Sequence, residues 1–170
     1  MQILRTGIVL GLAIVQTLSP SQRITKSDLV LVRTVFDGDT IEVERFGRVR
    51  LIGIDAPEIG QRFDTTAPFA REARDKLISL VLRHFVRLEQ DGPALDTYNR
   101  RLAYVVREDG LFVNAEIVRE GLARVTARTP IVRLDELKRA EQEAQTFRRG
   151  MWGDAPRIPA PTPLRPGRRS

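Results

Sequence analysis

The early strand-like segments constrain the fold most strongly, because the connections between them are short. Residues 27–35 are rich in Leu and Val, residues 40–44 alternate apolar with polar side chains, and residues 48–54 are again rich in apolar side chains. The first connection carries the turn pair Asp-Gly, and the second is a tight turn at Phe46-Gly47. Parallel strands need a crossover of about a dozen or more residues. These segments therefore predict antiparallel pairing and argue against a parallel α/β fold.

The rest of the sequence adds short strands and three helices. Apolar residues recur at helical spacing after Pro68 and again after Asp135, where Phe147 is expected on the same buried face as Leu137. Further strands are predicted at 86–89, 101–106 and 122–126, and a short helix at 114–120. This pattern predicts one α+β domain, mainly β, whose strands close into a small barrel.

Both ends of the chain differ from this domain, which we place at residues 27–154. Residues 1–22 begin with a basic segment followed by a short apolar run, which is typical of the signal peptide of a secreted or periplasmic protein. An uncleaved membrane anchor is the alternative, although the run is shorter than the roughly 20 residues that span a bilayer. Residues 155–170 are rich in Pro and Arg and are predicted to be disordered.

Composition excludes several classes of function. The formal net charge is +6, but residues 31–156 contain 21 Lys and Arg against 21 Asp and Glu, so the excess lies in the two ends. Composition alone therefore does not identify a nucleic-acid-binding protein. The absence of cysteine excludes disulfides, zinc–thiolate sites and thiol nucleophiles, and His84, the single histidine, is expected on the surface, which excludes histidine-based triads.

Acidic residues gather at the predicted open end of the hairpin. If Phe46-Gly47 forms its turn, Asp39 pairs with Ile54, so that Asp39 and Asp55 lie side by side, with Asp37 and Glu58 near in sequence. Three or four crowded carboxylates repel one another unless a cation is present, and oxygen ligands favour calcium or magnesium. Each motif alone is also typical of an ordinary turn or strand end. Their convergence is what favours a metal site.

Two arginines are candidates for binding an anion. Arg50 has Ile52 and Ile54 as neighbours on its predicted face, and a guanidinium among apolar side chains is costly to bury unless an anion meets it. Arg100 immediately precedes a predicted strand. The spacing of both, taken alone, is more typical of solvated or salt-bridged strand residues, so both interpretations stay open at this point.

Five segments, in order along the chain, resemble the motifs of the staphylococcal nuclease (thermonuclease) family. They are Val-Phe-Asp-Gly-Asp-Thr-Ile, Val-Arg-Leu-Ile-Gly-Ile-Asp-Ala-Pro-Glu, Asp-Thr-Tyr-Asn-Arg-Arg-Leu-Ala-Tyr-Val, Val-Asn-Ala-Glu-Ile-Val-Arg-Glu-Gly-Leu-Ala and Arg-Arg-Gly-Met-Trp. The resemblance covers residues 29–153 and implies a five-stranded OB-fold barrel with three helices. It also implies calcium-dependent hydrolysis of DNA and RNA that leaves 5′-hydroxyl and 3′-phosphate ends.

The resemblance implies a calcium site and a residue that acts on water. Asp39 and Asp55 match the carboxylate ligands of calcium, and the backbone carbonyl of Ala56 matches a further ligand. The family often has threonine at the position of Ala56, and a backbone ligand survives that change whereas a hydroxyl contact does not. Glu58 matches the residue that positions or deprotonates the attacking water.

The resemblance also implies that two arginines bind the phosphate. Arg50 and Arg100 match these arginines, and the planar fork of a guanidinium can bind two phosphate oxygens at once. Tyr98 matches a side chain near the nucleotide. The family usually has glycine before the second arginine, but here Asn99 occupies that position, and asparagine tolerates a left-handed backbone.

Nucleotide preference is not implied by the match. The staphylococcal enzyme has a pair of tyrosines after the Gly-Leu-Ala segment, where this chain has Ala127 and Thr129. Base stacking can therefore differ, while DNA and RNA remain the expected substrates. We expect a monomer, and anchoring to a membrane would be through the N-terminal apolar segment.

Two other classes of function fit an OB-fold. One is a non-catalytic nucleic-acid-binding module, and the other is a barrel that binds proteins. The set Asp39, Arg50, Asp55, Glu58 and Arg100 exceeds what binding alone requires, and the neutral central segment gives no specific support to protein binding. Nicking of plasmid DNA with calcium, and then with chelator, distinguishes the three.

The four arginines of the last fourteen residues generate a prediction about salt dependence. Truncation after Asp154 should leave kcat on a short oligonucleotide nearly unchanged, because no matched residue lies beyond it. Affinity for long DNA should fall and depend less steeply on salt, because fewer counterions are released on binding. A salt titration of binding in a Glu58→Gln background measures both slopes, and equal slopes would mean that the tail is inert, the alternative we hold open.

Overall fold

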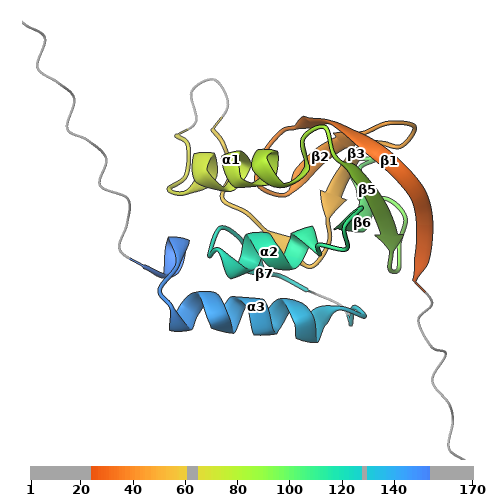
Figure 1. Cartoon of the computed structure of the whole chain (residues 1–170). Helices are drawn as coiled ribbons and strands as arrows, with labels where there is room; N and C mark the ends of the chain where they lie inside the picture. Colours follow the sequence, from red (N-terminus) through yellow and green to blue (C-terminus); the bar gives the residue numbers. More distant parts are fainter. Residues whose placement is uncertain (1–23, 61–64, 128–129, 154–170) are drawn as a thin grey trace, which may run out of the picture.

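The computed structural model describes residues 24–60, 65–127 and 130–153, and five of its strands form a closed barrel (Figure 1). The strand order is β1-β2-β3-β6-β5, and only the β3–β6 pair is parallel. The barrel strands are β1 Thr25–Val35, β2 Thr40–Val43, β3 Gly47–Leu51, β5 Phe85–Gln90 and β6 Arg101–Arg107. This architecture confirms the predicted five-stranded OB-fold barrel.

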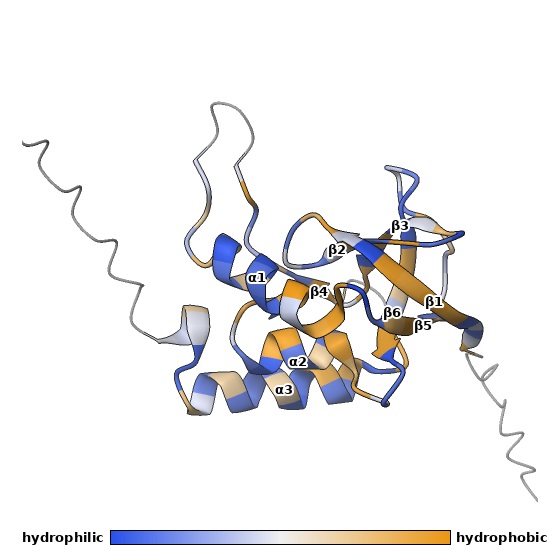
Figure 2. Ribbon diagram, turned by 45° about the horizontal axis from the view of Figure 1, so that its top comes forward, coloured by the Kyte–Doolittle hydropathy of each residue, from blue (hydrophilic) through white to orange (hydrophobic). Residues whose placement is uncertain are grey.

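The three predicted helices are also present, and they stack beside the barrel. They are α1 Ala70–Val81, α2 Val113–Arg119 and α3 Leu134–Thr146, followed by a short 3₁₀ helix, η1 Gly150–Trp152. Helix α2 lies between α1 and α3 and is the most apolar of the three (Figures 1 and 2). Its residues Ile117 and Val118 are fully buried, as is Leu77 of α1, so the helices and the barrel share one hydrophobic core.

The hairpin register predicted from the sequence is wrong. The turn between β2 and β3 contains three residues, with Arg45 in a left-handed conformation at φ 66°, and Thr40 pairs with Arg50. Asp39 therefore lies opposite Leu51, whose N–H donates to the Asp39 carbonyl at 2.8 Å, and not opposite Ile54. A longer turn shifts every pair by the same amount, because register follows from loop length.

The predicted strand 48–54 is in fact two strands joined by a corner. Strand β3 ends at Leu51, and Gly53, at φ 78°, redirects the chain into β4 Ile54–Asp55. Residues with a Cβ rarely adopt this φ, and a Cβ at Gly53 would also lie 2.6 Å from a methyl group of Leu137, so the corner favours glycine. Strand β4 pairs with β7 Arg124–Val125, which is all that remains of the strand predicted at 122–126.

One prediction about the last helix is also wrong. Leu137, Ala140 and Ala144 are buried as expected, but Phe147 lies just beyond the end of α3 and is 63% exposed. Because the helix ends at Thr146, the helical spacing that predicted Phe147 on the buried face does not extend to it. The segments predicted to be a signal peptide or anchor, 1–22, and a disordered tail, 155–170, lie outside the described residues. Within the described residues, no helix has the length and apolar character needed to cross a membrane.

Asn114 fixes the site-bearing corner to the helices. This fully buried side chain accepts a hydrogen bond from the Val105 N–H of β6 at 2.9 Å and donates one to the Ile52 carbonyl at 3.0 Å. Ile52 lies between β3 and β4, so a single amide joins α2, the barrel and the corner.

We predict that Asn114→Ala lowers the free energy of unfolding by about 2–4 kcal/mol, because it leaves a buried N–H and a buried carbonyl unpaired. Urea denaturation measures this change. Gln145→Ala, which alters an exposed amide on α3, is the control and should change stability by less than about 0.5 kcal/mol. Equal stability of the two variants would contradict the role assigned to Asn114.

Candidate active site

Arg50 connects the residues that the sequence analysis selected around the corner. Its Nη2 lies 3.0 Å from Asp39 Oδ2 and 2.7 Å from Asp55 Oδ1. Its Nη1 donates to the carbonyls of Leu51 at 2.9 Å and Ile54 at 2.8 Å. The guanidinium is thus held by two carboxylates and two carbonyls, and its side chain is only 16% exposed. The anion that a buried arginine requires is supplied by the two aspartates.

Asp39 is buried where a carboxylate is costly. Only 5% of the residue is exposed, and this burial raises its pKa to about 7. Arg50 and the Ala56 N–H, which donates to Asp39 Oδ2 at 2.7 Å, both oppose the shift because they stabilise the charged form. The Thr40 hydroxyl donates to the other carboxylate oxygen at 3.1 Å. Burial therefore disfavours the charged form of Asp39, and the neighbouring positive charge and hydrogen-bond donors favour it.

The turn before β2 places Asp39 against the corner. Asp37 Oδ1 accepts the Asp39 N–H at 3.0 Å, the hydrogen bond of an Asx turn. Between them, Gly38 lies so close to the corner and to α1 that a Cβ on it would be 2.6 Å from the Cβ atoms of both Ala56 and Ala73. The Asp-Gly-Asp order thus combines a turn former, a residue without a side chain and the site carboxylate.

The predicted cluster of three or four carboxylates is smaller in the structure. Asp37 is engaged in the turn, and only Asp39 and Asp55 meet at Arg50. In the described part of the chain, no group of three or more Asp, Glu, His or Cys side chains is arranged to hold a metal ion. Asp37 does not join the two aspartates because it precedes β2 and its side chain accepts the Asp39 N–H. The oxygen donors that remain for a hard cation are two carboxylates and backbone carbonyls.

Arg50 and Arg100 line the same cleft. Its volume is about 460 Å³, and it extends from the corner at 50–54 to the segment before β6. Arg100 is oriented by Asp96, whose Oδ2 accepts the Arg100 Nε–H at 2.7 Å. Burial alone would raise the pKa of Asp96, but hydrogen bonds from Arg100 and from the Tyr98 N–H lower it. The structure therefore brings together the two arginines that lie fifty residues apart in the sequence.

Tyr98 and Asn99 form the turn that carries Arg100. Asp96 Oδ1 accepts the backbone N–H groups of Tyr98 and Arg100, each at 2.9 Å. Asn99 has φ 60°, so asparagine does adopt the left-handed conformation expected at this position. The Tyr98 ring lies 5.3 Å from the Arg100 guanidinium and is 79% exposed, which leaves its outer face accessible.

Glu58 and Ala56 continue the chain from Asp55. Ala56 is buried, and its N–H contacts Asp39, so its backbone lies at the pair of carboxylates. Glu58 is exposed, and the Ala67 N–H donates to its backbone carbonyl at 3.0 Å. Within 24–60, 65–127 and 130–153, the Glu58 side chain has no hydrogen bond or ion pair. Its carboxylate is therefore near the corner in sequence but is not held by it.

Sequence reasoning missed two residues that shape the site. Asp96 orients Arg100, and an aspartate four residues before an arginine, in a turn-forming segment, was a signal that could have identified it. Arg124 pairs across the strands with Asp55, and no local signal indicated this. Of the two positions where the family's tyrosines are replaced, Ala127 lines the Arg50–Arg100 cleft, and Thr129 lies outside the described residues.

Comparison with known proteins identifies the family. The family model described as "Staphylococcal nuclease homologue" matches residues 48–154. The thermonuclease of Staphylococcus hyicus is 35% identical over 124 residues, which are 71% of this chain and 73% of that protein. The thermonuclease of Staphylococcus intermedius is 36% identical over 131 residues, 75% of this chain and 77% of that protein.

A longer relative matches as well. The SPbeta prophage-derived endonuclease YokF of Bacillus subtilis is 37% identical over 131 residues, 74% of this chain but 44% of that protein. The matched segments contain the corner, the Arg50–Arg100 cleft and the three helices. With the OB-fold barrel and these relatives in agreement, the chain belongs to the staphylococcal nuclease family.

Proposed function

We propose that this protein is a calcium-dependent phosphodiesterase that hydrolyses DNA and RNA and leaves 5′-hydroxyl and 3′-phosphate ends. The observation that carries the proposal is that Arg50 contacts both Asp39 and Asp55 and lines the same cleft as Arg100. Arg50 thus links a pair of carboxylates to a cleft that it shares with a second guanidinium. The similarity to thermonucleases and to an endonuclease supports nuclease activity.

The residues at the corner fit a hard cation in their donor chemistry. Asp39, Asp55 and the backbone carbonyl of Ala56 would hold calcium, and all three supply oxygen, which calcium prefers. The raised pKa of Asp39 supports this assignment, because a buried carboxylate gains from a nearby positive charge. Bound calcium would supply positive charge against the negative charge that develops on the phosphate.

The arginines bind and orient the phosphodiester. Arg100 is held by Asp96 through one nitrogen, so the rest of its planar fork remains for phosphate oxygens. Arg50 Nη2 contacts Asp55, which is exposed to solvent. A phosphate that enters the cleft can therefore compete with Asp55 for Arg50 Nη2. The contacts of Arg50 with the two carbonyls do not depend on Asp55, so they keep the guanidinium at the corner during this exchange.

Glu58 positions or deprotonates the attacking water. Its exposed side chain follows the buried segment of Ala56 and has no partner among the described residues that would compete for its carboxylate. A group that acts on water must come within hydrogen-bond reach of that water, so its lone pairs have to be free of other partners. Tyr98 lies beside the nucleotide, where its exposed ring can contact a base or sugar.

The main alternative is a non-catalytic nucleic-acid-binding OB-fold module. Arg50 and Arg100 alone would serve such a module, but neither a buried Asp39 nor Glu58 contributes to phosphate binding. These carboxylates favour the enzyme. The pattern of residues 1–22 supports a secreted or periplasmic location for it.

We predict that the protein nicks plasmid DNA with calcium, that chelator stops the reaction, and that Asp39→Asn or Asp55→Asn abolishes it at ordinary calcium concentrations. Loss of one of two carboxylates should weaken binding of the cation strongly. Asp75→Asn, which alters an exposed carboxylate on α1, is the matched control and should retain activity. Full activity of either site variant in excess chelator would refute the metal assignment.

We also predict that Glu58→Gln lowers kcat by a factor on the order of 10² or more while KM changes little, because the residue acts in the chemical step. Steady-state kinetics on a defined oligonucleotide measure both constants. Glu72→Gln, another exposed glutamate, should leave both unchanged. A Glu58→Gln variant with raised KM and normal kcat would instead make Glu58 a binding or structural residue.

A further inference from the structure

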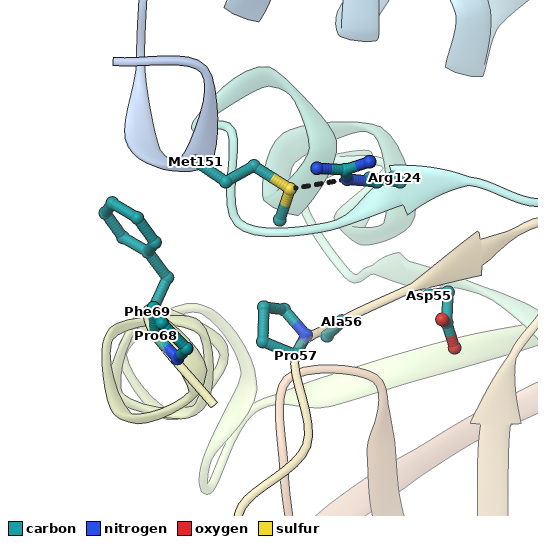
Figure 3. Close-up of a pocket in the computed structure, with 7 residues that line it drawn as sticks. All are labelled: Asp55, Ala56, Pro57, Pro68, Phe69, Arg124 and Met151. Atoms are coloured by element: carbon teal, nitrogen blue, oxygen red, sulfur yellow. Dashed lines mark hydrogen bonds between the residues drawn. The ribbon is translucent and has the colours of Figure 1, made fainter. Parts of the chain in front are cut away.

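A second cleft adjoins the proposed catalytic centre. It has a volume of about 350 Å³ and is lined by Asp55, Ala56, Pro57, Pro68, Phe69, Arg124 and Met151 (Figure 3). The segment 54–57 borders both clefts, because Ile54 lines the Arg50–Arg100 cleft while the next three residues line this one. A polynucleotide whose scissile phosphate lies at the corner would therefore meet this second cleft with a neighbouring nucleotide.

Arg124 supplies positive charge to the second cleft. It is the register partner of Asp55 in the β4–β7 pair, so the two side chains project from the same face of the ribbon. Asp55 Oδ1 nevertheless accepts its hydrogen bond from Arg50 Nη2. Across the described ranges, no carboxylate lies within ion-pair distance of Arg124, although most arginines of the site have one. Its charge is thus available to an anion from outside the chain.

The Arg124 guanidinium is held in place without being neutralised. It lies 4.9 Å from the centre of the Trp152 ring, and its Nε–H donates to Met151 Sδ at 3.1 Å, as the dashed line in Figure 3 shows. Aromatic and thioether contacts orient a guanidinium but leave its charge and its Nη donors available. This is the arrangement expected of a preoriented phosphate ligand.

The opposite wall of the cleft is apolar. Pro57, Pro68 and Phe69 form this wall, and the Phe69 side chain extends from it in the direction of Met151 (Figure 3). Phe69 has φ 66°, a left-handed conformation that is unfavourable for a bulky residue. Such a conformation persists only where the surrounding structure imposes it, and Phe69 lines the cleft.

We propose that this second cleft is a subsite for a nucleotide adjacent to the scissile phosphate, with Arg124 binding its phosphate and the apolar wall contacting its sugar or base. The inference rests on the proposed nuclease function and extends it, because it makes the substrate a strand longer than one phosphodiester. The carboxylate of Asp55 at one end of the cleft is paired with Arg50 in the structure and would be paired with calcium in the proposed enzyme, so its negative charge is balanced in both cases. Single strands are bound by this combination of basic groups and aromatic rings.

Trp152 provides a readout that does not depend on cleavage. It is the only tryptophan of the chain and lies against Arg124, so a phosphate that binds Arg124 should change the intrinsic fluorescence. In a Glu58→Gln background with calcium, single-stranded oligonucleotides of two to eight nucleotides are titrated while gels monitor their integrity. We expect a saturable change with the longer strands and little change with the dinucleotide.

Arg124→Met tests the proposed contact between Arg124 and a phosphate, because it removes the guanidinium and retains the aliphatic part of the side chain. The substitution should abolish the fluorescence change and, with Glu58 restored, raise KM for an octanucleotide by about tenfold. The dinucleotide, whose only phosphate lies at the corner, should keep its KM. Arg87→Met removes one exposed charge on β5 and is the matched control, which should preserve both measurements. Arg124→Lys, which keeps the charge without the planar fork, should give an intermediate KM.

The outcomes separate this inference from the proposed function. Suppose that Arg124→Met abolishes a saturable fluorescence change in the Glu58→Gln background, but that the wild-type protein cuts no nucleic acid. This result would refute the nuclease proposal and leave the nucleotide subsite standing. Cleavage with an unchanged octanucleotide KM in Arg124→Met, or an equal loss in Arg87→Met, would overturn the subsite and leave the nuclease standing. A dinucleotide KM that rises as much as that of the octanucleotide would also overturn it, because Arg124 would then act at the corner.

Discussion

The guanidinium of Arg50 is the interaction on which the site depends. It joins Asp39, just before β2, to Asp55 of β4, and it binds the carbonyls on both sides of the Gly53 corner. Without this cation, two carboxylates would face each other and two carbonyls would lose a donor in a largely buried place. One side chain therefore links the chain path at the corner, both carboxylates and the charge at the cleft.

The fold keeps this corner rigid from both sides. On the barrel side, Thr40 pairs with Arg50 across β2 and β3, and Leu51 donates to the Asp39 carbonyl. On the helix side, Asn114 binds the Ile52 carbonyl from α2. Because these contacts involve backbone groups of the corner, they constrain its path whatever side chains occupy the surface. A site held in this way positions its charges before a substrate arrives, which lowers the cost of reorganisation on binding.

The sequence predicts which segments form strands and helices better than it predicts the register in which the strands pair. A two-residue turn predicts that Asp39 pairs with Ile54 and lies beside Asp55. The true turn has three residues and that pairing is absent, yet the two carboxylates do meet at Arg50. They meet because Gly53 bends the chain back, so a corner replaces the hairpin register that was assumed. Local patterns identify strands, turn formers and the end of α2 at Gly121, since these depend on neighbouring residues. The partnership of Asp55 with Arg124 depends on a pairing across the chain, which no local pattern contains.

The pairing of individual arginines, which also depends on contacts across the chain, explains how a neutral domain can attract a polyanion. Across residues 31–156 the acidic and basic residues are equal in number, so overall charge provides little attraction. What matters is which arginines are already neutralised. Arg119 and Arg149 bind the carboxylate of Glu143 and serve the packing of α3. Arg124 instead lies against Trp152, where its charge is retained, and Arg100 shares its fork with a single aspartate. Under the proposed function, a strand of phosphates would be recognised through these two guanidiniums, which line the two clefts that border the corner.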